Sequence, residues 1–466
     1  MSYLSIEFGL LFIAFFALYW GCRLLPKLQN KLLLIVSYLV VCSYSWQFAL
    51  ILFIYTCVIY FLSIKIYKSE YHARRWLILS ICVAITNLAI FKYFDFFRYE
   101  LQNLLNFLNI SLLLPVVSVL IPIGISFYTF HSVSYLVSIK KKEIPVTKFW
   151  NFALFLSFFP SIIAGPINRA KDFLPQIAIS EPREILEPLR AFTLIILAII
   201  KVYCLGGLIS DNWVKPIFAN PLEFNVIDLV VGLYAYAMQI YLNFSGYTDL
   251  VTGIALLLGF RLPINFNCPY LSLNLREFWG RWHISLSYWI RDYIYIPLGG
   301  NRRSFTRTQI NVMVAMLLSG LWHGAGINFI IWGACHGIGI VALNIGDKYL
   351  GRDWLTKRSS FAARLLTWHY ICFTWLFFNS ESLADALDYL VALTHNFSVE
   401  PHYAGAFLII CFIYLAYPIC KNLPDWFTTQ LSKLNQSYLP FVFILILWLV
   451  IYIAPSGVPN FIYANF

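Results

Sequence analysis

Two histidines stand in a long stretch of the chain that has no acidic residue, lysine or arginine. The stretch runs from Thr308 to Gly346 and contains His323 and His336. At 1.5 Å per helical residue it is long enough for about two bilayer crossings. An ionisable side chain at membrane depth is costly, so it marks a functional site by default. Because histidine exchanges protons near neutral pH, the stretch predicts proton transfer to or from a substrate within the bilayer.

The residues around His323 indicate how the chain runs there. His323 follows Trp322 and precedes Gly324-Ala325-Gly326, and these glycines predict a helix end or bend with close backbone approach. The alternative reading is a buried histidine that is hydrogen-bonded between helices, and the residues alone leave both readings open. His336 lies between Cys335 and Gly337, where helix packing is the favoured role.

An arginine-rich segment from Arg276 to Arg307 precedes this stretch. It has six arginines against Glu277 and Asp292, and it also contains His283. Its aromatic and leucine residues recur at three- and four-residue steps, which predicts an interfacial helix with one apolar stripe: Trp279, Trp282, Leu286, Trp289 and Tyr293. The segment is either an interfacial anchor or a cytoplasmic platform for a phosphate-bearing ligand, since arginine binds phosphate bidentately.

Polar residues also gather between Gln239 and Asp249. Asn243 and Gly246 suggest an interrupted helix there, and interhelical hydrogen bonding is the favoured role for most of these side chains. Asp249 needs a partner if it is buried, and the arginine-rich segment is a candidate.

The composition places the chain in a membrane. Of its 466 residues 60% are hydrophobic and 12% are charged, against roughly 25% charged residues in a soluble domain. The net charge of +11 comes from basic residues between apolar runs, which is the positive-inside pattern and not a nucleic-acid surface. The ten cysteines are scattered, so neither a disulfide framework nor a metal site is expected.

We therefore predict an all-α, polytopic integral membrane protein of about ten to twelve membrane helices, with interfacial and re-entrant helices. Alternate loops near the N-terminus are basic, which predicts a periplasmic N-terminus. Pro122 and Gly124 break the apolar run before Lys140. A single membrane domain over residues 1–466 is expected, with N-terminal helices in 1–142, a catalytic core in 149–346 and C-terminal helices in 361–466. The main apolar runs are Tyr3–Trp20, Leu32–Trp46, Phe48–Ile64, Trp76–Phe91, Leu112–Ile139, Phe149–Ala164, Phe192–Ile209, Val226–Tyr241, Val251–Phe260, the stretch after Thr308, Phe361–Phe378, Phe407–Tyr417 and Pro440–Ile453.

These motifs resemble the membrane-bound O-acyltransferase superfamily, in particular the bacterial branch that O-acetylates exported polysaccharides such as alginate and peptidoglycan. The resemblance covers most of the chain, and its most specific part is Arg281-Trp282-His283-Ile284-Ser285-Leu286 followed by Leu321-Trp322-His323-Gly324. The other matching stretches are Pro122–Phe130, Gly165–Arg169, Asn243–Asp249, Glu277–Arg302, Ser319–Ala325, His336-Gly337 and Phe461–Tyr463.

By this resemblance, His323 is the catalytic histidine and His283 the second signature histidine of the family. The family fold is a ring of membrane helices around a thinned centre, and its acyl donor comes from the cytoplasm. Acetyl transfer from a thioester to a hydroxyl needs a base, for which His323 is suited, and an oxyanion donor. His283, Asn243 or a backbone N–H of residues 324–326 could be that donor. The residues expected to bind the donor or support the histidines are Arg276, Arg281, Trp282, Arg291, Asp292, Asn243 and Trp322.

The resulting hypothesis is a bacterial inner-membrane O-acetyltransferase that acts on a cell-envelope polysaccharide. We expect acetyl-CoA or an acyl carrier as the donor, a periplasmic SGNH-type acetyltransferase or esterase as partner, and no bound cofactor, metal or nucleic acid. One alternative is D-alanyl transfer to teichoic acid from a carrier protein. Another is a polysaccharide or acyl transporter, which would more often show paired intramembrane charges.

Overall fold

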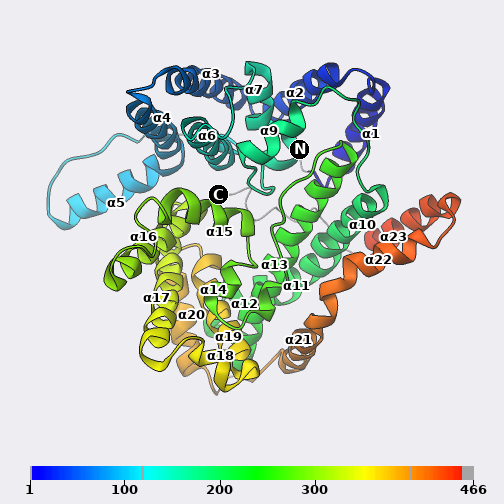
Figure 1. The fold of residues 1–466 in the computed structure, drawn as a ribbon. Helices are drawn as coiled ribbons and strands as arrows, with labels where there is room; N and C mark the ends of the chain where they lie inside the picture. The colour runs from blue at the N-terminus through cyan, green and yellow to red at the C-terminus, as the bar shows by residue number, and fades with distance from the viewer. Residues whose placement is uncertain (1–2, 117–119, 399, 454–466) are drawn as a thin grey trace. The chain divides into compact units, whose positions relative to one another are not determined.

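The computed structural model describes residues 3–116, 120–398 and 400–453, and within these ranges the secondary structure is helical throughout, with no strand. The chain forms two compact units (Figure 1). The first comprises Met1–Leu186 with Ile254–Pro263, and the second comprises Glu187–Gly253 with Ile264–Phe466. The expected all-α class is confirmed. The single-domain organisation stays a prediction.

The first unit begins with four helices, α1 to α4, that are joined by short turns. Ser5 and Ser45 cap α1 and α3 through their hydroxyls. Lys65 and Lys68 lie in the last turn of α3, where the helix dipole stabilises positive charge. α6 begins directly after Gly124, whose φ of 75° is left-handed, so the predicted break at this glycine is confirmed. The helices are α1 (Ile6–Gly21), α2 (Pro26–Cys42), α3 (Trp46–Lys68), α4 (Ala73–Leu88), α5 (Phe94–Phe107), α6 (Ile125–Lys140), α7 (Phe149–Ser157), α8 (Phe159–Ile162) and α9 (Ala170–Ile177).

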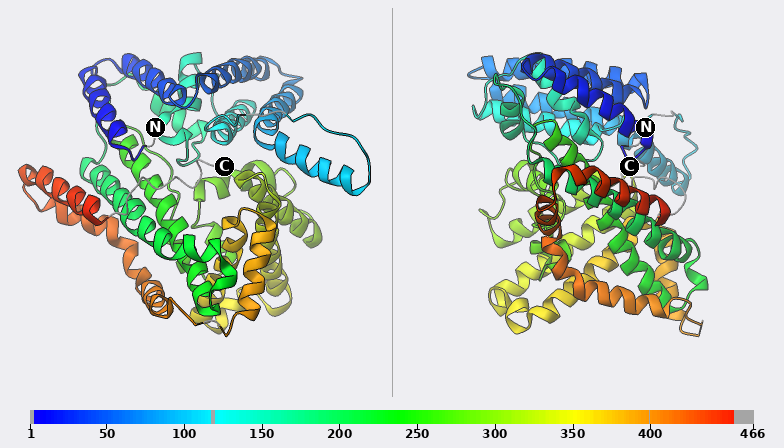
Figure 2. Two further views of the ribbon diagram at one scale, coloured as in Figure 1. Left: turned by 180° about the vertical axis from the view of Figure 1, so that it is seen from behind. Right: turned by 90° about the vertical axis from the view of Figure 1, so that its right-hand side faces the viewer.

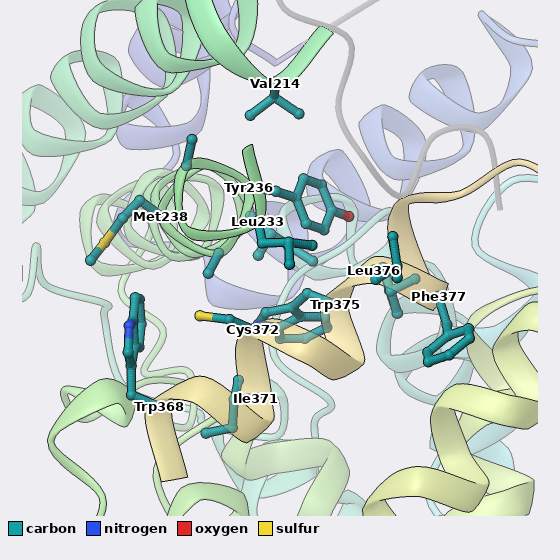
Figure 3. Close-up of a cluster of buried hydrophobic side chains, with 14 of the residues drawn as sticks. Val214, Leu233, Tyr236, Met238, Trp368, Ile371, Cys372, Trp375, Leu376 and Phe377 are labelled. Atoms are coloured by element: carbon teal, nitrogen blue, oxygen red, sulfur yellow. The ribbon is translucent and has the colours of Figure 1, made fainter. Parts of the chain in front are cut away.

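The second unit contains both signature histidines. α16 and α17 form a helical hairpin (Figure 1), and α23 lies beside α10 (Figure 2). Its core lies between α13 and α19, where Trp368, Cys372 and Trp375 face Leu233 and Met238 (Figure 3). The helices are α10 (Pro188–Ile199), α11 (Gly207–Ile209), α12 (Lys215–Ala219), α13 (Val226–Leu257, which ends in the first unit), α14 (Leu275–Trp279), α15 (Ile284–Ile290), α16 (Phe305–His323), α17 (Ile327–Leu350), α18 (Trp354–Arg358), α19 (Ser360–Asn379), α20 (Leu383–His395), α21 (Ala404–Ala416), α22 (Leu423–Ser432) and α23 (Leu439–Ile453).

The expected interruption at Asn243 and Gly246 is wrong, because α13 is one continuous helix of 32 residues. An interior glycine costs a helix only about 1 kcal/mol relative to alanine. At Gly246 the missing side chain allows a neighbouring segment to approach. A Cβ on Gly246 would lie 2.8 Å from Val202 Cγ2, on the π-helical segment Ile200–Gly206. Gly246 therefore serves packing.

The expected continuous interfacial helix with one apolar stripe is also wrong. α14 ends at Trp279, and His283 is left-handed with φ 43° before α15 begins. The chain then passes through a π-helical turn at Arg291–Tyr295 and a turn at Gly299-Gly300, where both glycines have positive φ. A left-handed residue cannot continue an α-helix, so the three- and four-residue spacing breaks at His283.

The structure has five helices that are long and apolar enough to cross a membrane, among the described residues. They include the 35-residue run Ala73–Phe107, in which α4 continues into α5 where the sequence suggested a mixed segment. A bent pair over Ala404–Ser432 would raise the number to six. The chain is thus a multi-pass membrane protein, and the count of ten to twelve membrane helices stays a prediction.

Candidate active site

His323 is held at the end of a tightly packed hairpin. It is the last residue of α16, and Gly324 continues in extended conformation, which confirms the predicted helix end. A Cβ on Gly324 would lie 2.1 Å from the Phe329 ring, so any larger residue would have to displace that ring. Two further glycines bring α16 and α17 together, since a Cβ on Gly320 would lie 2.2 Å from the Phe329 carbonyl oxygen and one on Gly333 2.4 Å from that of Met316. This close backbone approach fixes the position of His323.

His283 is held by the backbone that flanks it. The Ile284 N–H donates to the Asn265 carbonyl oxygen at 3.0 Å. The Ser285 N–H and hydroxyl both donate to Asn265 Oδ1, at 3.2 and 2.7 Å. Asn265 therefore caps α15 and keeps His283 in its left-handed conformation. The His283 ring is fully buried, and neither of its nitrogens has a hydrogen-bond partner among the residues that the structure describes.

The two histidine rings lie near each other in an aromatic enclosure. Their centroids are 6.3 Å apart. The ring centroid of Phe244 lies 4.7 Å from that of His283. The Trp322 ring packs against both histidines, with its centroid 5.7 Å from that of His283 and 4.8 Å from that of His323. His323 is 2% exposed, so the enclosure excludes most water from it. Two imidazoles in such surroundings can accept a proton and orient a polar substrate group.

Two more aromatic rings close the enclosure on the His323 side. Trp332 of α17 lies 5.0 Å from the His323 centroid, and Phe378 of α19 lies 5.1 Å from it. Sequence reasoning missed both, because an aromatic residue in an apolar run has the same pattern as ordinary core. It missed Asn265 for a similar reason, since a lone asparagine far from His283 in the sequence gives no sign of capping α15.

All three arginines that were expected to bind the donor take part in ion pairs within the chain. Arg276 pairs with Asp347 of α17 at 2.6 Å. Arg281 pairs with Glu277 at 2.8 Å. The first pair ties the segment to α17, and the second lies within the segment.

Arg291 forms the third pair, with Asp292 at 2.7 Å, and its guanidinium lies 4.5 Å from the Tyr288 ring centroid. The hydrogen bond to Asp292 raises the pKa of Arg291 above its ordinary value, so this arginine stays charged. The remaining arginines, Arg302, Arg303 and Arg307, are exposed. Their guanidinium groups have no ion-pair partner among the described residues.

Asn243 and Trp282 occupy different places around the histidines. Asn243 is buried on α13 beside Phe244, and a Cβ on Gly206 would lie 2.3 Å from its Oδ1. Its amide thus packs on the π-helical segment, while the neighbouring Phe244 reaches His283. Trp282 is 1% exposed and packs in the core, where its ring centroid lies 5.0 Å from that of Trp375.

The sequence did not identify the partner of Asp249. The suggestion that the partner lies in the arginine-rich segment is wrong. Asp249 Oδ2 lies 2.7 Å from Lys201 Nζ, in a part-buried ion pair between α13 and the π-helical segment. Lys201 is the one charged residue in the apolar run Phe192–Ile209, and this isolated charge could have pointed to it as the partner of Asp249. His336 accords with its expected packing role, since its Nε2 lies 3.0 Å from the Thr374 hydroxyl.

The family model of the membrane-bound O-acyltransferases matches residues 128–384, which include both histidines and the rings around them. The chain belongs to the membrane-bound O-acyltransferase family. It is therefore an O-acyltransferase, and family membership decides for an enzyme over the transporter that hydropathy left open.

Individual relatives extend over more of the chain. A probable alginate O-acetylase of Pseudomonas aeruginosa is 35% identical over 369 residues, which are 77% of this chain and 68% of the relative. A peptidoglycan O-acetyltransferase of Helicobacter pylori is 34% identical, over 71% of this chain and 67% of the relative. A teichoic acid D-alanyltransferase of Bacillus subtilis is 26% identical, over 56% of this chain and 69% of the relative.

Proposed function

We propose that this O-acyltransferase moves acetyl groups from a cytoplasmic thioester donor, acetyl-CoA, to hydroxyls of a cell-envelope or exported polysaccharide. The observation that carries the proposal is the pair of buried imidazoles whose centroids lie 6.3 Å apart within the family match. The alginate and peptidoglycan relatives support acetyl as the acyl group and a polysaccharide as the acceptor.

In the proposed reaction His323 is the general base. It removes the proton of the attacking hydroxyl as the oxygen forms a bond to the thioester carbonyl carbon. The carbonyl electron pair moves to oxygen and gives a tetrahedral oxyanion. When the C–S bond breaks, the protonated imidazole returns the proton to the thiolate, so the products are an ester and a free thiol. A positioned base contributes about 10²- to 10⁴-fold to such a step.

His283 and the arginine-rich segment have supporting roles in this proposal. His283 orients the substrate or hydrogen-bonds to it through a ring nitrogen that has no partner among the described residues. Arg276, Arg281 and Arg291, with Asp292, Trp282, Trp322 and Asn243, bind the donor or hold the histidines. The charge pattern supports a bacterial inner-membrane location with a periplasmic N-terminus. A periplasmic SGNH-type acetyltransferase or esterase is the proposed partner.

The donor separates this proposal from D-alanyl transfer, for which the teichoic acid relative is the supporting observation. Purified enzyme in lipid nanodiscs is given radiolabelled acetyl-CoA, or a carrier protein charged with D-alanine, and the label released or transferred is measured. Turnover of acetyl-CoA is the expected result. Turnover of the charged carrier protein alone would replace the acetyl proposal with the D-alanyl one.

A further inference from the structure

The indole of Trp332 is a buried hydrogen-bond donor beside His323 that the structure leaves unused. Trp332 is fully buried, and its Nε1 has no hydrogen-bond partner among the residues that the structure describes. A buried tryptophan N–H usually finds an acceptor, because leaving one unsatisfied costs about 1–3 kcal/mol. An orphaned donor next to a candidate catalytic base is a place where an acceptor that arrives with the substrate would bind.

Trp332 is placed for this role by the hairpin that holds His323. It lies on α17, in the candidate span Ile327–Leu350, and meets the His323 ring edge-on with an interplanar angle of 85° and centroids 5.0 Å apart. The adjacent Gly333 is one of the two points where α16 and α17 are in close backbone contact. Trp332 is therefore one of the rings that border His323.

His336 lies on the other side of Trp332 and has a hydrogen-bond partner of its own. Its centroid lies 4.8 Å from that of Trp332. The Thr374 hydroxyl lies 3.0 Å from His336 Nε2 and 2.8 Å from the Ile371 carbonyl oxygen. His336 is thus tied to α19 through Thr374. Trp332 lies between the rings of His323 and His336, and its indole N–H has no partner among the described residues.

We propose that Trp332 is a catalytic residue. Its indole N–H donates a hydrogen bond to the thioester carbonyl oxygen and stabilises the oxyanion formed when the hydroxyl attacks. This proposal rests on the proposed acyl transfer. As the C–O bond forms, the carbonyl electron pair moves to oxygen, and the indole N–H donates to that oxygen while His323 holds the hydroxyl proton. When the C–S bond breaks, the oxyanion returns to a carbonyl and the hydrogen bond weakens. A fixed donor in a water-poor site contributes most where the charge develops, so it acts on the rate of the chemical step.

The test compares Trp332→Phe with Trp375→Phe. Trp375 stacks on Trp332 at 5.8 Å and shares its contact with Phe378, so the two variants remove similar bulk from one cluster. Both are purified in nanodiscs, and kcat and KM for acyl transfer are measured with a thioester that the wild-type enzyme accepts. We expect Trp332→Phe to lower kcat about 10²- to 10³-fold with KM for the donor nearly unchanged. Trp375→Phe should keep kcat within a few-fold of wild type.

A second variant separates the N–H from the shape of the ring. Benzothienylalanine at position 332 has sulfur where indole has N–H and keeps nearly the same volume. It should reproduce the kcat loss without a decrease in thermal stability, because it removes an unsatisfied buried N–H, even if Trp332→Phe folds poorly. Wild-type kcat with benzothienylalanine, or equal losses in Trp332→Phe and Trp375→Phe, would overturn the proposal. Since the donor is chosen by wild-type activity, a wrong acetyl-CoA assignment leaves this comparison intact.

Discussion

His323 and His283 differ in how they are held, and this difference predicts unequal roles. His323 ends a 19-residue helix at the closely packed α16–α17 hairpin, whereas His283 is a left-handed residue fixed through Asn265. The base must remove the one proton that the reaction loses. A group that only orients a substrate can be partly replaced by water or a neighbouring N–H.

We predict that His323→Ala lowers acyl transfer at least 10²-fold while the protein still inserts and folds. The reason is loss of the base, because no other group at that place takes the hydroxyl proton in the proposed mechanism. Glycan acetylation is measured at matched membrane levels, with His72→Ala as control, since His72 is exposed in the turn before α4. Wild-type acetylation by a well-inserted His323→Ala protein would remove His323 from the mechanism.

For His283 we predict a strong decrease that leaves more residual activity than His323→Ala. Two variants are compared, His283→Ala and His283→Asn, because asparagine tolerates the left-handed φ of 43° that alanine adopts with strain. Single-turnover acyl transfer gives the rate of the chemical step for each. If both His283 variants were inactive while His323→Ala kept measurable turnover, the two roles would have to be exchanged.

His323 could be predicted from the residues alone because an imidazole is conspicuous in a charge-free apolar stretch, whereas His283 lies in the arginine-rich segment and was singled out by the family resemblance. Trp332 and Phe378 could not, because apolar side chains in apolar runs give no chemical contrast with the core. Their role depends on which faces of α16, α17 and α19 meet, and that is decided by packing. Asn265 is a similar case, since its capping of α15 is a contact across 20 residues of chain.

Among the elements, the α16–α17 hairpin has the most direct effect on the site. We predict that Gly333→Ala lowers acyl transfer about 10- to 100-fold without preventing insertion. Its Cβ would lie 2.4 Å from the Met316 carbonyl oxygen, so α16 must shift, and His323 at the end of α16 would shift with it. A displacement of about 1 Å at a reacting group can cost about 10²-fold in rate.

Gly9→Ala is the matched control for this prediction. Gly9 lies within α1, and a Cβ there would have nothing within 4 Å. The control should keep wild-type activity and gain a little helix stability, as alanine does over glycine. Both variants are assayed for acyl transfer and thermal unfolding. Unchanged activity in Gly333→Ala would show that the hairpin contact does not position His323.

Helix boundaries were predictable where proline and glycine, or several glycines, stand close together in the sequence. They were not predictable from single residues that only weaken a helix. Gly124 after Pro122 does start α6, and Gly324 does follow the end of α16. Asn243 and Gly246 were misread because their modest helix cost is outweighed by the close packing that Gly246 allows against Val202. The helical spacing from Trp279 to Tyr293 was misread because the left-handed turn at His283 is invisible to periodicity.

At the scale of the whole chain, the family match gathers the site in one part of the sequence. Every residue placed around the histidines, from Asn243 to Phe378, lies within residues 128–384. The helices α1 to α5 lie before that match. The order of charges along the chain carries the remaining information, because it sets which loops face the cytoplasm.

The last prediction is that the segment from Arg276 to Arg307 faces the cytoplasm. Its six arginines against two acids set the side, since basic residues are retained on the cytoplasmic side of membrane proteins. Arg302 is exposed, so Arg302→Cys provides a labelling site in a protein whose ten native cysteines, Cys42 and Cys82 among them, are replaced by serine.

A membrane-impermeant maleimide should label that cysteine in inverted inner-membrane vesicles and not in intact spheroplasts. The same preparations, assayed for protection by acetyl-CoA, report whether the donor binds at this face. Labelling of spheroplasts from outside would place the segment in the periplasm, and both the topology and the donor role of its arginines would then be wrong. Cytoplasmic labelling that acetyl-CoA slows would connect the exposed arginines to the donor, because the phosphates of CoA are the groups that guanidinium binds bidentately.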